Sequence, residues 1–180
     1  MKKWLRILGV IVLITILVII LIKVTKREFE TFTFPDTMIV ENYSDNKMAD
    51  TITMVLLNKV LDFDTMTIYI HTIPPAFLNH EEYDFKALIS KPQFVDNVYN
   101  LYLKDKLGMI SLKHALTHEI LHLEQYESGR LMVLPDNYGY VWEGDTIKYS
   151  DVDYKRREHE IEAIKGTRSL KYKLNEVLYK

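Results

Sequence analysis

The stretch His114–Gln125, HALTHEILHLEQ, carries two histidines four residues apart within a run of helical apolar spacing. On a helix His118 and His122 lie one above the other, so both rings project from one face. At about 100° per residue, a separate apolar stripe is formed by Leu112, Ala115, Leu116, Ile120 and Leu123. The pattern predicts a helix that buries this stripe and leaves the histidine face free for a ligand.

The pentapeptide from His118 to His122 is H-E-x-x-H. Two imidazoles at this spacing can bind one zinc ion through bonds of about 2.0–2.1 Å without bending the helix. Glu119, rotated about 100° from His118, is poorly placed as a third ligand but can reach a water on the open side of the metal. That is the position of a general base. The alternative interpretation is an exposed polar face that happens to contain histidine.

A catalytic zinc usually has three protein ligands, and the third must come from elsewhere. Arg156–Ile164, RREHEIEAI, offers four candidates on a predicted helix: Glu158, His159, Glu160 and Glu162. With Ile161 and Ile164 marking the apolar side, Glu160 lies nearest that side. Glu158 is close behind and Glu162 is turned away, so spacing alone leaves Glu160 and Glu158 open.

The combination of H-E-x-x-H with a later E-x-E-A resembles the zincin metallopeptidases of the gluzincin kind. The resemblance covers residues 118–122 and 157–163, and it implies that Glu160 is the third zinc ligand. It also implies that Arg157 orients the ligand carboxylate and that Ala163 permits close helix packing. The chain departs from the CAAX-type membrane zincins, which have several spans and an acidic residue where this chain has Ile164.

Peptide hydrolysis by such a site passes through a negatively charged intermediate that needs a donor besides the metal. The candidates near Glu160 in the sequence are Tyr149, Tyr154 and Arg157. The predicted strand Phe94–Lys104 resembles the zincin edge strand that pairs with an extended substrate. An interior strand is the alternative.

The first 27 residues form a basic-flanked apolar segment, and Leu5–Ile22 is long enough to cross a bilayer of about 30 Å. The segment ends in bulky and charged residues rather than the small residues of a cleavage site. We therefore expect an uncleaved transmembrane signal anchor over 1–27, with a cleaved signal peptide as the alternative. The slight charge asymmetry favours a domain on the extracytoplasmic side.

Charge and cysteine content argue against two other classes of protein, namely nucleic-acid-binding proteins and proteins that depend on cysteine chemistry. Six of the 23 Lys and Arg residues lie in the first 27 positions, so residues 28–180 carry 17 basic against 25 acidic side chains, a net charge of −8. An acidic domain argues against a nucleic-acid partner. The chain has no cysteine, which excludes disulfides, Cys nucleophiles and Cys-based zinc sites.

Residues 28–180 are expected to form one small α+β, zincin-like domain, with a mixed sheet, an active-site helix and a C-terminal ligand helix. Strands are expected at 36–42, 65–72 and 94–104. Helices are expected at 44–62, from a Ser111 cap to about Glu127 with Gly129 as the stop, and from about Lys155 with a break or kink at Gly166. Residues 73–90 are expected to be helical or irregular, and 130–154 a long connection.

Together these features predict a membrane-anchored, zinc-dependent metallopeptidase in which Glu119 activates a zinc-bound water against a peptide or protein substrate. The ligands would be His118, His122 and Glu160. The alternative is a non-catalytic, membrane-anchored binding or assembly protein on a zincin-like fold.

Overall fold

The computed structural model describes residues 36–63, 65–74, 86–92, 95–135 and 138–179. The transmembrane anchor expected over 1–27 lies outside these residues. Within the described ranges, no helix combines the length and the apolar character needed to cross a bilayer. The elements are β1 (Met38–Asn42), α2 (Ala49–Met54), the π-helix η1 (Val55–Val60), β2 (Met66–Thr72), β3 (Ala87–Ser90), β4 (Val98–Leu103), α4 (Met109–Glu127), β5 (Leu131–Val133), β6 (Gly139–Trp142), β7 (Asp145–Lys148), the 3-10 helix η3 (Tyr154–Arg156) and α5 (Glu158–Leu178).

The larger sheet has four strands in the order β1-β2-β4-β3. β1, β2 and β4 are parallel, and β3 pairs antiparallel with β4. Buried residues alternate with more exposed ones along β2 and β4, and in β4 the side chains of Tyr99, Leu101 and Leu103 face the core. The expectation that residues 94–104 form an edge strand is wrong, because β3 occupies that edge.

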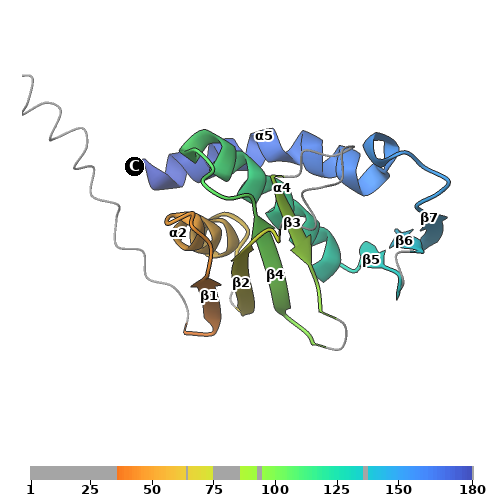
Figure 1. Cartoon of the computed structure of the whole chain (residues 1–180), viewed down its shortest axis with the longest axis horizontal. Coiled ribbons are helices and arrows are strands. Elements are labelled where there is room, and N and C mark those ends of the chain that lie inside the picture. The colour runs from red at the N-terminus through yellow and green to blue at the C-terminus, as the bar shows by residue number, and fades with distance from the viewer. Residues whose placement is uncertain (1–35, 64, 75–85, 93–94, 136–137, 180) are drawn as a thin grey trace, which may run out of the picture. The chain divides into compact units, whose positions relative to one another are not determined.

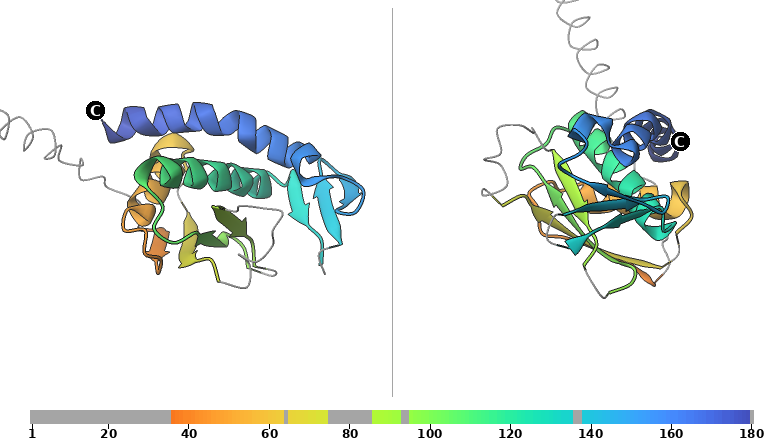
Figure 2. Two further views of the ribbon diagram at one scale, coloured as in Figure 1. Left: turned by 45° about the horizontal axis from the view of Figure 1, so that its top comes forward. Right: turned by 90° about the vertical axis from the view of Figure 1, so that its right-hand side faces the viewer.

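The helices pack on one face of this sheet, with α5 lying alongside α4 (Figures 1 and 2). The predicted apolar stripe of α4 is buried in full, and Leu116, Ile120 and Leu123 have no exposed area. These side chains pack with those of the strands and of α2, η1 and α5 in one core. Because the apolar face of α4 is buried, the direction in which its histidine face points is fixed.

Helix α4 begins at Met109 rather than at the expected Ser111 cap. The buried side chain of Asn46 holds the preceding loop, since it donates to the Lys104 carbonyl (3.0 Å) and accepts from the Leu107 N–H (2.9 Å). These two hydrogen bonds fix the loop that leads into α4, and Ser111 lies inside the first turn of this helix. The predicted end is confirmed, because the helix stops at Glu127 and Gly129 has φ +71°.

Two segments without a strand prediction contain strands. Residues 130–154 form a three-stranded antiparallel sheet, β5-β6-β7, rather than a plain connection. A two-residue turn joins β6 to β7, with positive φ at Glu143 (49°) and Gly144 (96°), as a tight hairpin requires. The region 73–90 ends in strand β3, whose four residues are too few to show a clear alternation in the sequence.

Helix α5 runs unbroken through Gly166, so a break at this position, one of the two expected outcomes, is wrong. A Cβ at Gly166 would lie 3.0 Å from Leu121 Cδ1, which shows that the glycine allows α5 to approach α4 closely. Ala163 is fully buried on the same side. Ile164, expected on the apolar side, is 58% exposed, because the buried face runs through Ala163, Thr167 and Leu170.

Gly139 provides a test of the second sheet. A Cβ there would lie 2.1 Å from the Ile147 carbonyl oxygen, a backbone atom that cannot move without breaking the β6–β7 pairing. We expect Gly139→Ala to lower the free energy of unfolding by about 1–3 kcal/mol in urea denaturation of the full-length chain. Gly108→Ala is the control, since a Cβ at that position meets nothing within 4 Å. Equal stability of the two variants would contradict the strand pairing.

Candidate metal centre

Three side chains from two helices converge at one end of the α4–α5 pair. His118 and His122 project from one face of α4, and their Nε2 atoms lie 3.2 Å apart. Glu160, from the first turn of α5, places Oε2 3.3 Å from His118 Nε2 and 3.4 Å from His122 Nε2. Among the described residues, this is the group of three whose ligand atoms are close enough to hold a metal ion.

The spacing of these atoms fits a tetrahedral metal site with bonds as long as those of zinc. Four ligands about 2.0–2.1 Å from a central zinc lie about 3.3–3.4 Å from one another. The three observed separations of 3.2, 3.3 and 3.4 Å are the edges of one face of such a tetrahedron. The donor set, two imidazoles and one carboxylate, is also one that zinc accepts.

The hydrogen bonding of Glu160 supports the same fit. Its Oε2 is buried and has no hydrogen-bond partner, although two imidazole nitrogens face it. A buried carboxylate oxygen requires a hydrogen-bond donor or a positive charge beside it. A cation at the centre of the three atoms would satisfy Oε2 and both nitrogens together, so the residues present fit a metal ion.

The electrostatics of the cluster favour a charged carboxylate. Burial alone would raise the pKa of Glu160, but the imidazoles of His118 and His122 lower it well below its usual range. Burial likewise would lower the pKa of His122, but Glu160 and Glu119 raise it to about 9. Without a metal, the site thus favours positive charge beside Glu160.

Glu119 is buried next to the three candidate ligands but is held by a different element. Its Oε2 accepts a hydrogen bond from the Ile89 N–H of β3 (2.8 Å). Burial raises the pKa of Glu119 above its usual value, which makes the carboxylate a stronger base. The edge strand of the larger sheet therefore fixes the orientation of this acid.

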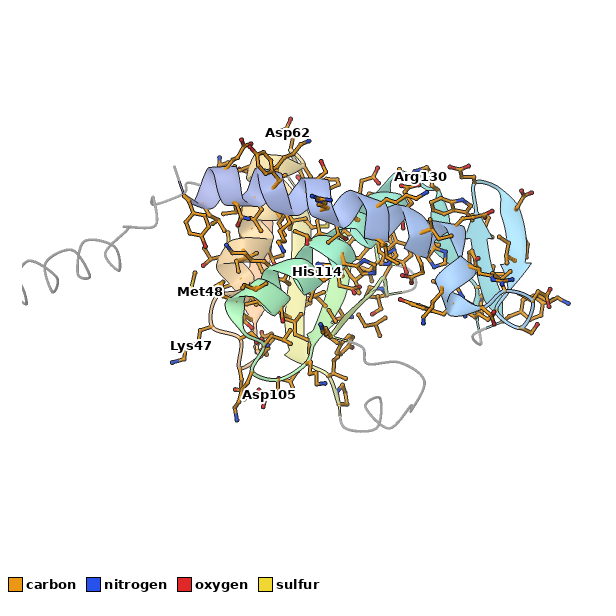
Figure 3. All side chains as sticks on the ribbon, turned by 90° about the horizontal axis from the view of Figure 1, so that it is seen from above. Lys47, Met48, Asp62, Asp105, His114 and Arg130 are labelled. Atoms are coloured by element: carbon orange, nitrogen blue, oxygen red, sulfur yellow. The ribbon has the colours of Figure 1, made fainter. Side chains whose placement is uncertain are left out.

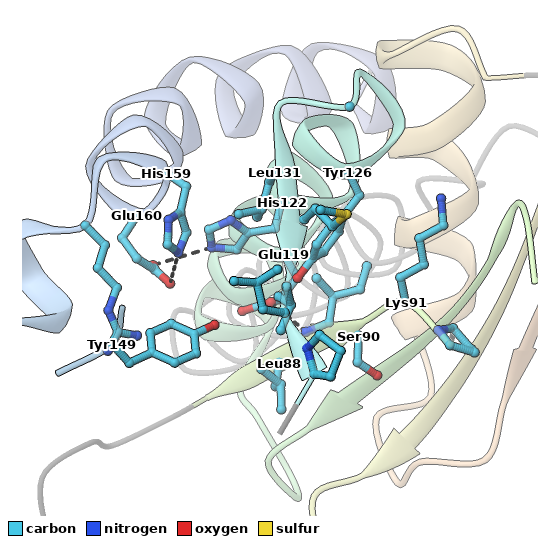
Figure 4. A pocket seen from close by; sticks show the side chains of 18 of the residues that line it. Leu88, Ser90, Lys91, Glu119, His122, Tyr126, Leu131, Tyr149, His159 and Glu160 are labelled. Atoms are coloured by element: carbon cyan, nitrogen blue, oxygen red, sulfur yellow. Dashed lines mark hydrogen bonds and ion pairs between the residues drawn. The ribbon is translucent and has the colours of Figure 1, made fainter. Parts of the chain in front are cut away.

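A cavity of about 910 Å³ opens beside the cluster, and Glu119, His122 and Glu160 are part of its wall (Figure 4). One side is formed by β3 with the residues that follow it, and the opposite side by β5. The Tyr149 hydroxyl projects into this space. Burial raises the pKa of Tyr149, so its hydroxyl remains a hydrogen-bond donor at neutral pH.

Tyr154 and Arg157 lie at the wall of the cavity beside Glu160. The Tyr154 hydroxyl is hydrogen-bonded to the Glu160 carboxylate. The Arg157 guanidinium lies 4.3 Å from the ring centre of Tyr149 and 5.2 Å from that of Tyr154. The contact that the resemblance assigns to Arg157 is thus provided by Tyr154, while Arg157 stacks on both tyrosines.

Other candidates from the sequence lie away from the cluster. Glu158 is exposed, and Glu162 forms a surface ion pair with Arg130 (2.7 Å). His114 is exposed in the first half of α4, one helical turn before His118 (Figure 3). His71 stacks between the rings of Tyr43 and Tyr102 on the larger sheet. His80 lies outside the described residues.

The sequence interpretation missed one site residue, Gln125, and considered a second, His159, in a different role. Gln125 is buried and accepts a hydrogen bond from His122 Nδ1 (2.8 Å). His159, weighed only as a ligand, is buried against the ring of Tyr140, with centroids 4.4 Å apart, and burial lowers its pKa to about 4. Only the position of Gln125, three residues after His122 on the same helix face, could have drawn attention to it.

Substitution at two neighbouring glutamates separates the candidate ligand from its surroundings. We expect Glu160→Gln to weaken zinc binding by the full-length chain by more than about 100-fold, beyond the usual effect of residues that only support a ligand. Glu158→Gln, two residues away and exposed, should bind zinc like the wild type. Zinc affinity is measured by competition with a chromophoric chelator. Loss of affinity in the Glu158 variant alone would reassign the third ligand.

The chain was compared with protein-family models, with curated proteins and with solved structures. No family model, curated protein or solved structure matches it. The chemistry of the site is carried by the side chains that converge there: two imidazoles, a carboxylate that faces both, and the buried Glu119 carboxylate on the helix of the imidazoles.

Proposed function

We propose that this protein is a zinc-dependent metallopeptidase that hydrolyses peptide bonds. The observation that carries the proposal is the convergence of His118, His122 and Glu160 within 3.4 Å of one another, beside Glu119 and at the wall of a large cavity. This arrangement combines a three-ligand site with a nearby base and space for a substrate. Those are the parts that metal-assisted hydrolysis needs.

Each residue has a role that follows from its position. Zinc, when bound, would supply Lewis acidity and lower the pKa of a coordinated water to about 7. Glu119 accepts the proton of the attacking water and returns it to the leaving amine. The Ile89 N–H holds Oε2 of Glu119, so the carboxylate keeps a fixed orientation while it exchanges the proton.

Two side chains are suited to stabilise the negative charge that develops on the scissile carbonyl oxygen. Tyr149 offers a hydroxyl donor inside the cavity, and Arg157 offers a positive charge stacked on the Tyr149 ring. Tyr154 is already hydrogen-bonded to Glu160, which suits it to holding the ligand rather than the substrate.

The cavity favours a substrate in extended conformation. Within the described residues β3 pairs with β4 alone, so its other edge faces the cavity. A peptide in the cavity can add to this edge through main-chain groups other than the Ile89 N–H, which donates to Glu119. Leu88, Leu131 and Met132 line the same space and offer apolar contact to substrate side chains.

The expected anchor at 1–27 would place this activity at a membrane, with the domain on the extracytoplasmic side. The alternative function, a non-catalytic binding or assembly protein, would use the same ligands as a structural site. A structural site does not require a buried acid beside the metal or a cavity at its fourth position. The presence of both favours hydrolysis.

Glu119→Gln tests the base. The substituted amide keeps an oxygen for the Ile89 N–H but cannot take a proton, so we expect zinc to be retained and peptide hydrolysis to fall by about 10²–10⁴-fold. Cleavage of a peptide library by the full-length chain is followed by mass spectrometry, with and without chelator. Glu124→Gln, on the same helix, serves as the control. Full activity of the Glu119 variant, or chelator-resistant cleavage, would refute the proposal.

Tyr149→Phe and Tyr154→Phe separate substrate stabilisation from ligand support. Loss of the Tyr149 donor should lower kcat by about 10²-fold with little change in zinc affinity. Loss of the Tyr154 hydroxyl should instead weaken zinc binding by about 10-fold. The exposed Tyr138→Phe is the control for both measurements. The reverse assignment of the two effects would exchange the roles of Tyr149 and Tyr154.

A further inference from the structure

Gln125 connects the two helices that carry the candidate ligands. It lies on α4 three residues after His122 and is 1% exposed. Its Oε1 lies 2.8 Å from His122 Nδ1, and its Nε2 donates to the main-chain carbonyl of His159 at 3.0 Å. His159 directly precedes Glu160 on α5. One buried amide therefore contacts a ligand side chain of one helix and the backbone beside a ligand of the other.

These two hydrogen bonds fix the tautomer of the neutral His122 ring. The His159 carbonyl can only accept, so the NH₂ group of Gln125 must face it. The carbonyl oxygen of the Gln125 amide then faces His122 and requires that Nδ1 carry a proton. A neutral His122 ring is consequently left with its lone pair on Nε2, the atom that faces His118 and Glu160.

The second hydrogen bond fixes the position of Glu160. Helices α4 and α5 run antiparallel, since Lys113 contacts Asn175 at one end and Gln125 contacts His159 at the other. The Gln125 bond lies at the end where Glu160 must meet the two imidazoles. A shift of α5 along α4 would move the Glu160 carboxylate away from both of them.

We propose that Gln125 is a positioning residue that sets the His122 tautomer and the register of α5, so that metal affinity depends on both of its hydrogen bonds. The inference rests on the proposed function only for its metal site. Outer residues of this kind typically change metal affinity by about 10–100-fold when substituted.

Two variants distinguish the loss of both hydrogen bonds from the loss of one. Gln125→Leu has a similar volume and removes both. Gln125→Glu keeps an acceptor for His122 Nδ1 but loses the donor to the His159 carbonyl. The control is Asn175→Leu, which removes the polar contact between α4 and α5 at the far end from the site.

Zinc affinity of the full-length variants is measured by competition with a chromophoric chelator, and the Co²⁺-loaded forms are compared by visible absorption. We expect Gln125→Leu to lose about 10–100-fold in affinity and to change the cobalt spectrum. Gln125→Glu should fall between Gln125→Leu and the wild type. Asn175→Leu should leave affinity and spectrum unchanged, whatever its effect on stability.

Wild-type affinity and spectrum in Gln125→Leu would overturn the proposal, and wild-type affinity in Gln125→Glu would overturn the part assigned to α5. A loss of affinity in Asn175→Leu as large as that in Gln125→Leu would also overturn it, because general loosening of the helix pair would then explain the effect. These outcomes are independent of peptide cleavage. A wild type that binds zinc but cleaves nothing would reject the metallopeptidase and leave the role of Gln125 standing.

Discussion

Glu160 is 6% exposed, and one of its oxygens has no hydrogen-bond partner although two imidazole nitrogens lie within 3.4 Å of it. A buried carboxylate is stable only beside positive charge or several donors. The two histidines come from α4 and the carboxylate from α5, so the compensation exists only while these helices keep their register. The antiparallel packing of α4 and α5 is therefore the constraint on which the candidate site depends.

Several features of the two helices stabilise this antiparallel packing. Gly166 lets α5 approach Leu121, and Ala163 is fully buried between the helices. The Gln125 amide fixes the end of the pair next to the ligands. On the other face of α4, the apolar stripe packs into the core above the sheet. One face of α4 therefore packs in the core, and the other face carries the imidazoles. The core packing holds the imidazoles in place.

Local patterns in the sequence predicted the local elements well. The alternation in Thr65–Thr72 gave strand β2, and the apolar stripe and Gly129 gave the course and the end of α4. Strand β3, by contrast, depends on pairing with β4 across a distant part of the chain, and four residues carry too little alternation to reveal it. The turn at Glu143–Gly144 was a usable hairpin signal for β6 and β7 that the interpretation of this region as a connection overlooked.

The candidate site shows the same contrast between features set by the local sequence and features set by contacts between distant residues. The i, i+4 spacing of His118 and His122 is a property of any helix and could be predicted without a fold. Spacing along the predicted C-terminal helix left Glu160 and Glu158 open as the third ligand, and the resemblance selected Glu160, because nothing local relates residue 160 to residue 122. The Ser111 cap and the Gly166 break failed for a related reason. Tertiary contacts at Asn46 and Leu121 outweigh the local preferences of serine and glycine.

The position of Glu119 is what separates a hydrolytic interpretation from a structural one. A site that only stabilises the fold would gain from an apolar residue here, because burial disfavours the charged carboxylate and raises its pKa. The fold instead supplies Ile89 N–H from the edge strand to hold this acid. The same strand lines the cavity in which a peptide can pair with it. In the proposed mechanism, this one hydrogen bond joins the candidate base on α4 to the strand proposed to bind substrate, and it holds the carboxylate in a fixed orientation.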